Sequence, residues 1–566
     1  MPPDGVDWNF DIDYLSKRGV GGGTSLLYNR PDFLGIGTPA NGVLDAWIIN
    51  DSGIDNLGYQ RRDLTYPSSF RGRSFWRHRQ DVGGGWQARG AAGWISDMNF
   101  LEEYYESEWE EGYEQRTWLD LRRPTDNRET RLLTSVRVDP FFTQTEWWPR
   151  LDHYWLGQPL VRDAVTWYEH SSASYARQNT PQTPTAGQGL QFWTLLPYEN
   201  NVIGEGFATR HELDLPFQAG AVKIVPYALG ELAHWGQDIT QSPLNRAYGQ
   251  VGIRSSMPMW TSDDTVESQL WNVHGLAHKV VFEGEFSYAN STQDVSQLPL
   301  YDQIDDDAIN QYRRNIPYWD YGAIPGQPTP LPSSLVFGPN GKYDPRYYAI
   351  RRGMGSWVTG PTEIVNDLTA FRLAARQRWQ TKRGPLGNRR IIDWITLDID
   401  GEMFPTTSQN FGQTLGLWQY DFRWHVGDRT TVLSSADVDF FTGGQQLYTV
   451  GALLNRTPRG SFYIGFNEFG GPIDASVLTG SYTYRMSPKW ASSFGTALNL
   501  KGMNIGQNFQ LVRIGESFLM TFGFNVDYSR NNVGVTFNLE PRFLSRTQFA
   551  SRTGLDIPMA GAYGLE

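Results

Sequence analysis

The residues best suited to chemistry are few and scattered. His274 and His278 are four apart, a spacing at which two imidazoles on a helix could share a zinc ion, but they open a segment whose pattern predicts a strand. Asp305–Asp307 could bind calcium, although a solvated acidic run is the commoner outcome. Gly19 and Gly21–Gly23 are placed in a hairpin turn with no helix after it, so they predict no phosphate loop. The chain has no cysteine for thiol chemistry. We therefore expect no enzymatic activity, no metal and no cofactor.

Composition narrows the class of protein. The 566 residues carry a net charge of −12, which argues against binding to nucleic acid. Aromatic residues make up 14% of the chain although its mean hydropathy is −0.48, so apolar and polar residues must be segregated between faces. No apolar run reaches 18 residues, so no transmembrane helix is predicted. The first residues have neither a basic nor an apolar segment, and we expect a signal peptide to be absent.

Apolar and polar residues alternate along much of the sequence with a period of two, which is typical of β-strands. The alternation is clearest at the two ends of the chain. Near the N-terminus, aromatic and aliphatic residues from Trp8 to Tyr14 alternate with polar ones. Near the C-terminus, the same pattern runs from Phe518 to Tyr528 and again from Val533 to Glu540. The apolar positions are heavy in aromatic residues, and the opposite positions are strongly polar, as expected for a membrane barrel with a polar interior.

Counting such segments predicts about 24–26 strands, of which about eleven lie between Leu368 and Phe543. The predicted fold is all-β: a large antiparallel transmembrane β-barrel forming one domain over residues 1–566. A soluble β-sandwich or propeller also alternates and stays open as an alternative. Two segments interrupt the pattern. The acidic, aromatic stretch Asp97–Glu114 is interpreted as a solvated loop or short helix. A long Pro-rich loop, about residues 295–365, is expected outside the membrane or folded into the lumen.

Three segments carry a resemblance to a known family. They are Thr145–Tyr154, which contains Trp148, Pro149, Arg150 and Leu151; Arg210–Phe217; and Ile224–Glu231, which contains Pro226. Together with the last strands they resemble the barrel portion of the lipopolysaccharide-assembly proteins, also called organic-solvent-tolerance proteins. The family's usual cysteines are not found in this sequence, and its periplasmic jellyroll domain is expected to be absent.

The resemblance implies a barrel of about 26 strands in the outer membrane that inserts lipopolysaccharide, or a related glycolipid, into the outer leaflet. It also implies a lipoprotein plug in the lumen, periplasmic lipopolysaccharide-bridge proteins and membrane lipid as partners. Exposing acyl chains to water costs about 0.8 kcal/mol per CH₂, so a lateral gate between the first and last strands would let the sugars pass through the lumen while the acyl chains enter the lipid.

The residues that the gate would use are assigned from the alternation. Gate positions are Trp8, Phe10, Ile12, Tyr14, Val535, Phe537, Leu539 and Pro541; luminal positions are Asn9, Asp11, Asp13, Thr536, Asn538 and Glu540. Pro541 removes a ladder donor and so weakens the seam, or it simply ends the strand. The alternative functions are a general porin or receptor barrel and a soluble all-β carbohydrate-binding protein.

Overall fold

The computed structural model describes residues 5–541 except residues 34, 59–61, 67, 111–114, 183–197, 303–343, 386, 457–458, 472–473, 501–503 and 529. These described residues contain 25 strands and a few short helices, so the predicted all-β antiparallel fold of 24–26 strands is confirmed. The chain divides into two compact units. Unit 1 comprises residues 1–255, 285–371 and 404–414, and unit 2 comprises residues 256–284, 372–403 and 415–566.

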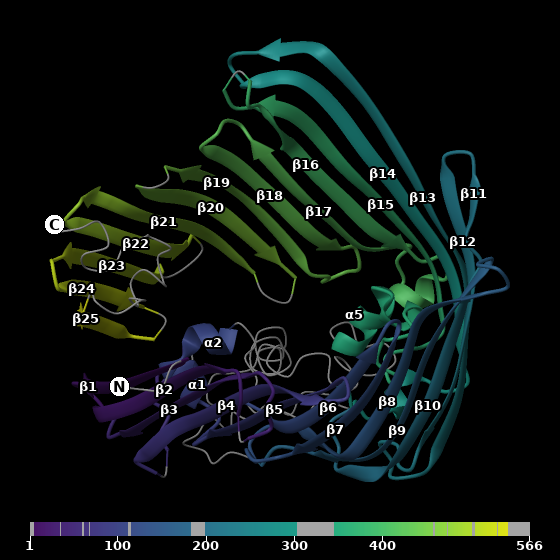
Figure 1. Cartoon of the computed structure of the whole chain (residues 1–566), viewed down its shortest axis with the longest axis horizontal. Helices are drawn as coiled ribbons and strands as arrows, with labels where there is room; N and C mark the ends of the chain where they lie inside the picture. Colours follow the sequence, from purple (N-terminus) through teal and green to yellow (C-terminus); the bar gives the residue numbers. More distant parts are fainter. Residues whose placement is uncertain are drawn as a thin grey trace. The chain divides into compact units, whose positions relative to one another are not determined.

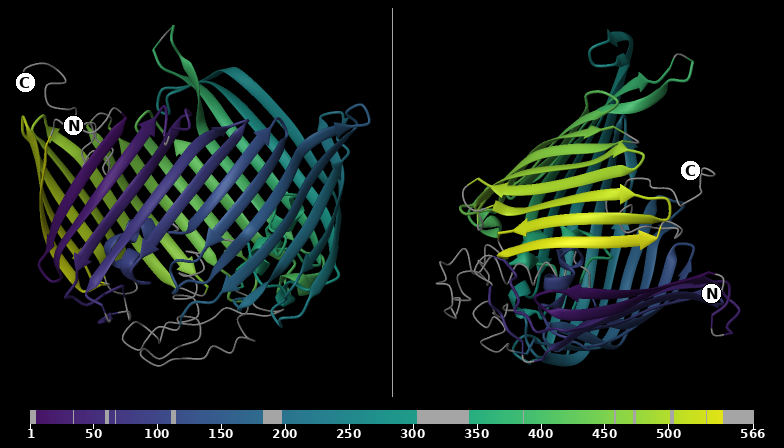
Figure 2. Two further views of the ribbon diagram at one scale, coloured as in Figure 1. Left: turned by 60° about the horizontal axis from the view of Figure 1, so that its bottom comes forward. Right: turned by 90° about the vertical axis from the view of Figure 1, so that its left-hand side faces the viewer.

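Unit 1 contains twelve complete strands. They are β1 (Val6–Leu15), β2 (Gly19–Arg30), β3 (Ala40–Asn50), β4 (Phe70–Gly83), β5 (Trp86–Ile95), β6 (Thr117–Thr125), β7 (Arg128–Val136), β8 (Gln144–Leu160), β9 (Val165–Asn179), β10 (Val202–Asp214), β11 (Phe217–Ala219) and β12 (Val222–Trp235). From β1 to β10 each strand pairs antiparallel with the next, and β12 pairs with both β10 and β11. Figure 2 shows these N-terminal strands, in purple and blue, side by side in chain order.

Unit 2 contains β16 (Arg390–Met403), β17 (Leu415–His425), β18 (Thr430–Asp439), β19 (Gln446–Asn455), β20 (Gly460–Gly470), β21 (Ala475–Ser487), β22 (Trp490–Asn499), β23 (Asn504–Ile514), β24 (Phe518–Asp527) and β25 (Asn532–Pro541). Each of these strands pairs antiparallel with the next (Figure 1). Three strands contribute residues to both units: β13 (Leu244–Ser268), β14 (Val273–Ser291) and β15 (Leu368–Arg383). Eleven strands, β15–β25, therefore follow Leu368, as predicted.

The first hairpin differs from the prediction. Its turn is residues 16–18, and β2 already begins at Gly19, so Gly21–Gly23 lie within a strand and not in the turn. Their small size has a local reason. A Cβ atom on Gly21 or Gly23 would lie 2.5 or 2.7 Å from the side chain of Trp47, which crosses this part of the sheet. The glycines make room for an indole ring.

The two faces of the strands differ in chemistry. In β24, Phe518, Met520 and Phe522 are exposed, whereas Leu519 and Thr521 between them are buried. In β1, Ile12 is 87% exposed, while Asp13 faces the other way and accepts a hydrogen bond from Nε1 of Trp47 at 2.7 Å. In unit 2, ion pairs link β15 to β16 on one face, between Arg378 and Asp398 and between Arg376 and Asp400. Apolar side chains are thus presented to the surroundings, and charged side chains are paired on the opposite face.

Two short helices cover the polar side of β3–β5. They are α1 (Phe100–Tyr104) and α2 (Glu106–Glu110). Their apolar residues form a core with the strands, made of Trp47, Ile49, Ile95, Phe100, Leu101 and Trp109. The prediction of short helical structure in Asp97–Glu114 is right for residues 100–110, but the prediction that this stretch is solvated is wrong, since even Glu102 is buried. Residues 111–114 lie outside the described residues.

The long connection between β14 and β15 also packs on the sheet. Its described parts, residues 295–302 and 344–367, are called the strap and contain η3 (Val295–Gln297), α5 (Pro345–Arg351) and η4 (Met354–Ser356). The Asp344 carboxylate caps α5 by accepting from the N–H of Arg346, and Pro345 occupies the first turn. Leu298 and Tyr301 pack against Trp147 and Trp235. The strap is thus folded onto the sheet, whereas Asp305–Asp307 lie outside the described residues. A further turn, η5 (Thr407–Asn410), precedes β17.

Among the described residues, no helix is long and apolar enough to span a membrane.

Candidate functional site on the polar face

The polar face of unit 1 is the face of its sheet that carries Trp47, Arg71, Arg150 and Arg210. It arises directly from the period of two: in β4, Arg71, Arg73, Phe75, Arg77 and Arg79 all project from this face. Most of the arginines on it are paired with carboxylates, as buried charges must be. Three clusters of ion pairs fasten other segments to the sheet.

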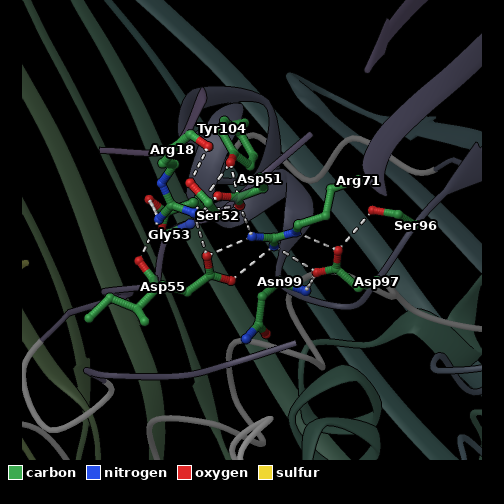
Figure 3. Close-up of polar contacts among 12 residues, drawn as sticks. Arg18, Asp51, Ser52, Gly53, Asp55, Arg71, Ser96, Asp97, Asn99 and Tyr104 are labelled. Carbon is green, nitrogen blue, oxygen red and sulfur yellow. Dashed lines mark hydrogen bonds and ion pairs between the residues drawn. The ribbon is translucent and has the colours of Figure 1, made fainter. Parts of the chain in front are cut away.

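The first cluster centres on Arg71, which is buried between three aspartates (Figure 3). Its guanidinium group donates to Asp51 at 2.8 Å, to Asp55 at 2.7 and 2.9 Å, and to Asp97 at 2.8 and 2.9 Å. Arg18, from the first turn, also contacts Asp51 and Asp55, at 2.7 and 2.9 Å. The two arginines hold together the first turn, the loop after β3 and the segment after β5.

This cluster also attaches α1. The hydroxyl group of Tyr104 donates to Asp51 at 2.6 Å, and Arg18 pairs with Glu103 at 2.5 Å. Burial opposes ionisation of Asp51, but the hydrogen bonds from Tyr104 and Gly53 and the neighbouring arginines outweigh it and hold the pKa of Asp51 below its ordinary value. The carboxylate therefore stays charged, and the attachment of α1 does not depend on pH in the neutral range.

The second cluster joins the strap to β8. Arg150 pairs with Asp152 at 2.9 Å in the same strand and with Asp302 at 2.5 Å in the strap. Nε2 of His170, in β9, lies 2.9 Å from Asp152. Because Arg150 is buried, removal of Asp152 or Asp302 would leave its positive charge only partly neutralised. Arg150 thus anchors the strap.

The third cluster joins the strap to β10, β12 and β13. Glu231 accepts from both Arg210, at 2.5 Å, and Arg246, and all three side chains are buried. Arg210 also donates to the backbone carbonyl groups of Trp357 and Gly360 at 2.9 and 3.2 Å. The guanidinium group of Arg210 therefore supplies hydrogen-bond donors to strap carbonyl groups that are not paired with a strand.

A titratable carboxyl group lies between these clusters. Glu363, in the strap, is 4% exposed, and its Oε2 atom has no hydrogen-bond partner among the described residues. Burial, reinforced by the charge of Asp302, raises the pKa of Glu363 to about 8. The group borders a cavity of about 20 Å³, enough for roughly one water molecule, that Arg150, Tyr301 and Asp302 also line.

The gate and luminal residues predicted from sequence alternate along β1 and β25, and both faces of these two strands are largely exposed. Trp8, Phe10, Ile12 and Tyr14 are all exposed on the apolar face of β1, and Asn9, Asp11 and Asp13 occupy the alternate positions. In β25, Val535, Phe537 and Leu539 are exposed and alternate with Thr536, Asn538 and Glu540; Nδ2 of Asn538 donates to Glu540 at 2.9 Å. Pro541 is the last residue of β25 and pairs with Phe518. β1 belongs to unit 1 and β25 to unit 2, and a seam between them stays a prediction.

The residues of the family motif surround an irregularity in β8. The register with β9 shifts between Trp147 and Arg150, where the Trp148–Pro149 peptide bond is cis. Trp148 and Leu151 are exposed on the apolar face, whereas Arg150 is buried on the polar face. Pro226 lies in β12 where β10 ends, and its carbonyl group accepts from the N–H of Leu215 at 2.9 Å.

The sequence analysis did not predict Arg18, Arg71 or Glu363, and it named Asp97, Arg210 and Glu231 only as ends of segments, with no ion-pair role. A usable signal existed for Arg71, since arginines at alternate positions of β4 mark a polar face. For Glu363 the sequence offers no signal, because its burial depends on how the strap folds back.

Comparisons with known proteins give a fold likeness only. No protein-family model matches the chain, and no curated protein is similar to it. A mutant form of the Rhodopseudomonas blastica porin aligns with 60% of this chain and 91% of its own, at 8% identity and a TM-score of 0.21. The siderophore receptor PirA from Pseudomonas aeruginosa aligns with 94% of this chain and 78% of its own, at 7% identity and a TM-score of 0.30. The pairing of the strands defines the fold, and membership of the lipopolysaccharide-assembly family is a proposal.

Proposed function

We propose that this chain is an outer-membrane β-barrel that moves lipopolysaccharide, or a related glycolipid, to the outer leaflet. The observation that carries the membrane location is the contrast between the two faces of the strands. In β8, β10 and β12, Leu151, Leu213 and Leu232 are exposed. Their neighbours Arg150, Glu212 and Glu231 are buried on the other face and form ion pairs. A soluble sandwich buries its apolar face, so this arrangement favours a lipid environment.

The proposed cargo rests on the sequence motifs and on physical suitability. A glycolipid has a polar headgroup, which suits the polar face, and acyl chains, which suit the lipid outside. A gate between β1 and β25 would release the acyl chains without exposing them to water, at a saving of about 0.8 kcal/mol per CH₂. The proposed partners are the lipopolysaccharide itself, a lipoprotein plug and periplasmic lipopolysaccharide-bridge proteins.

A general porin or receptor barrel is the second candidate. It needs the same two-faced strands but no gate, so the observation that supports the membrane location supports it equally. The strap and α1–α2 cover part of the polar face, which is also what a receptor with segments folded onto its inner face requires.

Depletion of the protein in its host tests the proposal. We expect surface lipopolysaccharide to fall while other outer-membrane proteins keep their levels, and normal surface lipopolysaccharide would refute the cargo. Purified protein in planar bilayers separates the candidates further, because a porin would conduct ions in the absence of any partner. The membrane location is tested first, by detergent-dependent extraction and by migration on gels that changes with heating; extraction without detergent would exclude it.

A further inference from the structure

Two arginines on the polar face stand directly opposite each other. Arg79 in β4 pairs with Arg89 in β5 in the antiparallel register, so both side chains project from the same face. Neither has an ion pair or a hydrogen bond among the described residues, in contrast with Arg71 and Arg73 in the same strand. Like charges at directly opposite positions destabilise a strand pair. The chain keeps this unfavourable pair although its net charge is −12.

Two carboxylates of the described strands share this face, and neither forms an ion pair with Arg79 or Arg89. Asp81 lies two residues after Arg79 and accepts from the side chain of Gln87 at 3.2 Å. Asp120, in β6, is directly opposite Arg89, but both of its oxygen atoms accept from other arginines. Oδ2 accepts from Nε of Arg122 at 2.6 Å, and Oδ1 accepts from Nε of Arg131 at 3.0 Å. Arg77 lies on the same face as Arg79, two residues before it. Positive charge therefore accumulates here, and Arg77, Arg79, Arg89 and Arg122 are called the arginine patch.

The arginine patch lies near the strand ends that are joined by the β4–β5 and β6–β7 turns. The apolar face at these ends carries tryptophans next to arginines. Trp86, three residues from Arg89, has the guanidinium group of Arg123 at 5.9 Å from its ring centre. At the same end, Arg128 lies 5.0 Å from the ring centre of Trp155. Tryptophans with basic residues above them are typical of the level of lipid headgroups. The arginine patch is therefore at headgroup level, on the opposite face of the sheet.

We propose that the arginine patch binds a phosphate group, and that Arg79 and Arg89 grip it from two adjacent strands. Guanidinium groups suit phosphate because their planar fork donates two parallel hydrogen bonds to its oxygens. An anion between the two side chains also removes the repulsion that their register creates. With the proposed function, on which this extension rests, the phosphate belongs to the headgroup of the glycolipid cargo.

The test compares two double variants of the full-length protein in detergent micelles. Arg79→Gln/Arg89→Gln removes the grip, and Arg123→Gln/Arg128→Gln removes the same charge from the apolar face. The probes are inorganic phosphate, lipid A with its phosphates, and lipid A from which the phosphates have been removed. We expect phosphorylated lipid A to bind the wild type and the control at least ten-fold more tightly than Arg79→Gln/Arg89→Gln, and dephosphorylated lipid A to show no such difference.

Thermal unfolding separates binding from a structural role. Without phosphate, Arg79→Gln/Arg89→Gln should be as stable as the wild type or more so, because the repulsion is gone. Addition of phosphate should raise the Tm of the wild type and of Arg123→Gln/Arg128→Gln, but not that of Arg79→Gln/Arg89→Gln. If the wild type binds inorganic phosphate and Arg79→Gln/Arg89→Gln does not, the patch is a general phosphate site. If the wild type binds phosphorylated lipid A but not inorganic phosphate, the patch is a headgroup site. Either outcome supports the proposal.

Equal affinity of the wild type and Arg79→Gln/Arg89→Gln for both phosphate probes would overturn the proposal. So would a lower Tm of that variant without phosphate, since the pair would then be structural. The outcome is independent of cargo transport. A patch that fails to bind, in cells whose surface lipopolysaccharide falls on depletion, refutes the patch alone; a patch that binds, in cells with normal lipopolysaccharide, refutes the cargo alone.

Discussion

The attachment of the strap should weaken as pH rises, and Glu363 should be the cause. Its pKa is about 8 in the folded protein against an ordinary value of 4.5. The folded state therefore holds a proton that the unfolded state releases between these two values. Stability is greatest at low pH and is lost as pH rises, with a limiting slope of about 1.4 kcal/mol per pH unit. Between pH 5 and pH 7 the loss is on the order of 2 kcal/mol.

Hydrogen exchange of the strap amides in residues 344–367 measures this loss. After correction for the intrinsic exchange rate, the protection of the wild type should fall by more than about ten-fold between pH 5 and pH 7. In Glu363→Gln, which keeps the size of the side chain, protection should not change with pH. In Asp302→Asn the fall should be smaller and end at a lower pH, because the charge of Asp302 contributes to the raised pKa of the folded state. An equal pH dependence in wild type and Glu363→Gln would refute the reasoning.

Three further perturbations test the fold. Arg71→Met should lower the free energy of unfolding by about 3–5 kcal/mol, because three buried aspartates lose their partner, and adding Asp97→Asn should recover part of it; an unchanged urea midpoint would contradict this. Burial raises the pKa of Asp139, which accepts from the N–H of Ile95 at 3.2 Å, to about 7, so Asp139→Asn should raise the Tm more at pH 8 than at pH 5, since the penalty grows between the unfolded and the folded pKa; a rise of equal size at both would exclude titration as its cause. Ile12→Arg should impair folding into lipid vesicles by up to about 2–4 kcal/mol, with Asn9→Arg as the control on the other face; equal effects would argue against lipid contact of that face.

The strands could be predicted from sequence because each alternation is local. Trp8 to Tyr14 and Val533 to Glu540 carry their pattern within a few residues, and a period of two fixes which residues share a face. The same reasoning placed Asn9, Asp11 and Asp13 on the face opposite to Ile12, where Asp13 does accept a hydrogen bond from Trp47. It failed for Gly21–Gly23, since glycine is as compatible with a turn as with a strand that makes room for an indole ring.

The partners of the charged residues could not be predicted, because they are distant in sequence. Arg150 and Asp302 are 152 residues apart, and Arg210 reaches the carbonyl group of Trp357 across 147 residues. The acidic residues of Asp97–Glu114 predict a solvated segment. Its helices pack against the sheet because Arg18 and Arg73, from other elements, neutralise Glu103 and Glu108. A charged segment is buried when its countercharges are supplied elsewhere, and a local pattern does not contain that information.

The two segments on the polar face are attached by groups that respond differently to pH. Arginine stays charged at every accessible pH, and the pKa of Asp51 is held below its ordinary value, so the attachment of α1–α2 is constant from pH 5 to pH 8. The strap has arginine contacts of the same kind at Arg150 and Arg210, but it also carries Glu363, which ionises within that range. Raising the pH should therefore loosen the strap while α1–α2 stays in place. Hydrogen exchange resolves the two segments in one experiment, and a parallel loss of protection in both would show that global unfolding, and not Glu363, is the cause.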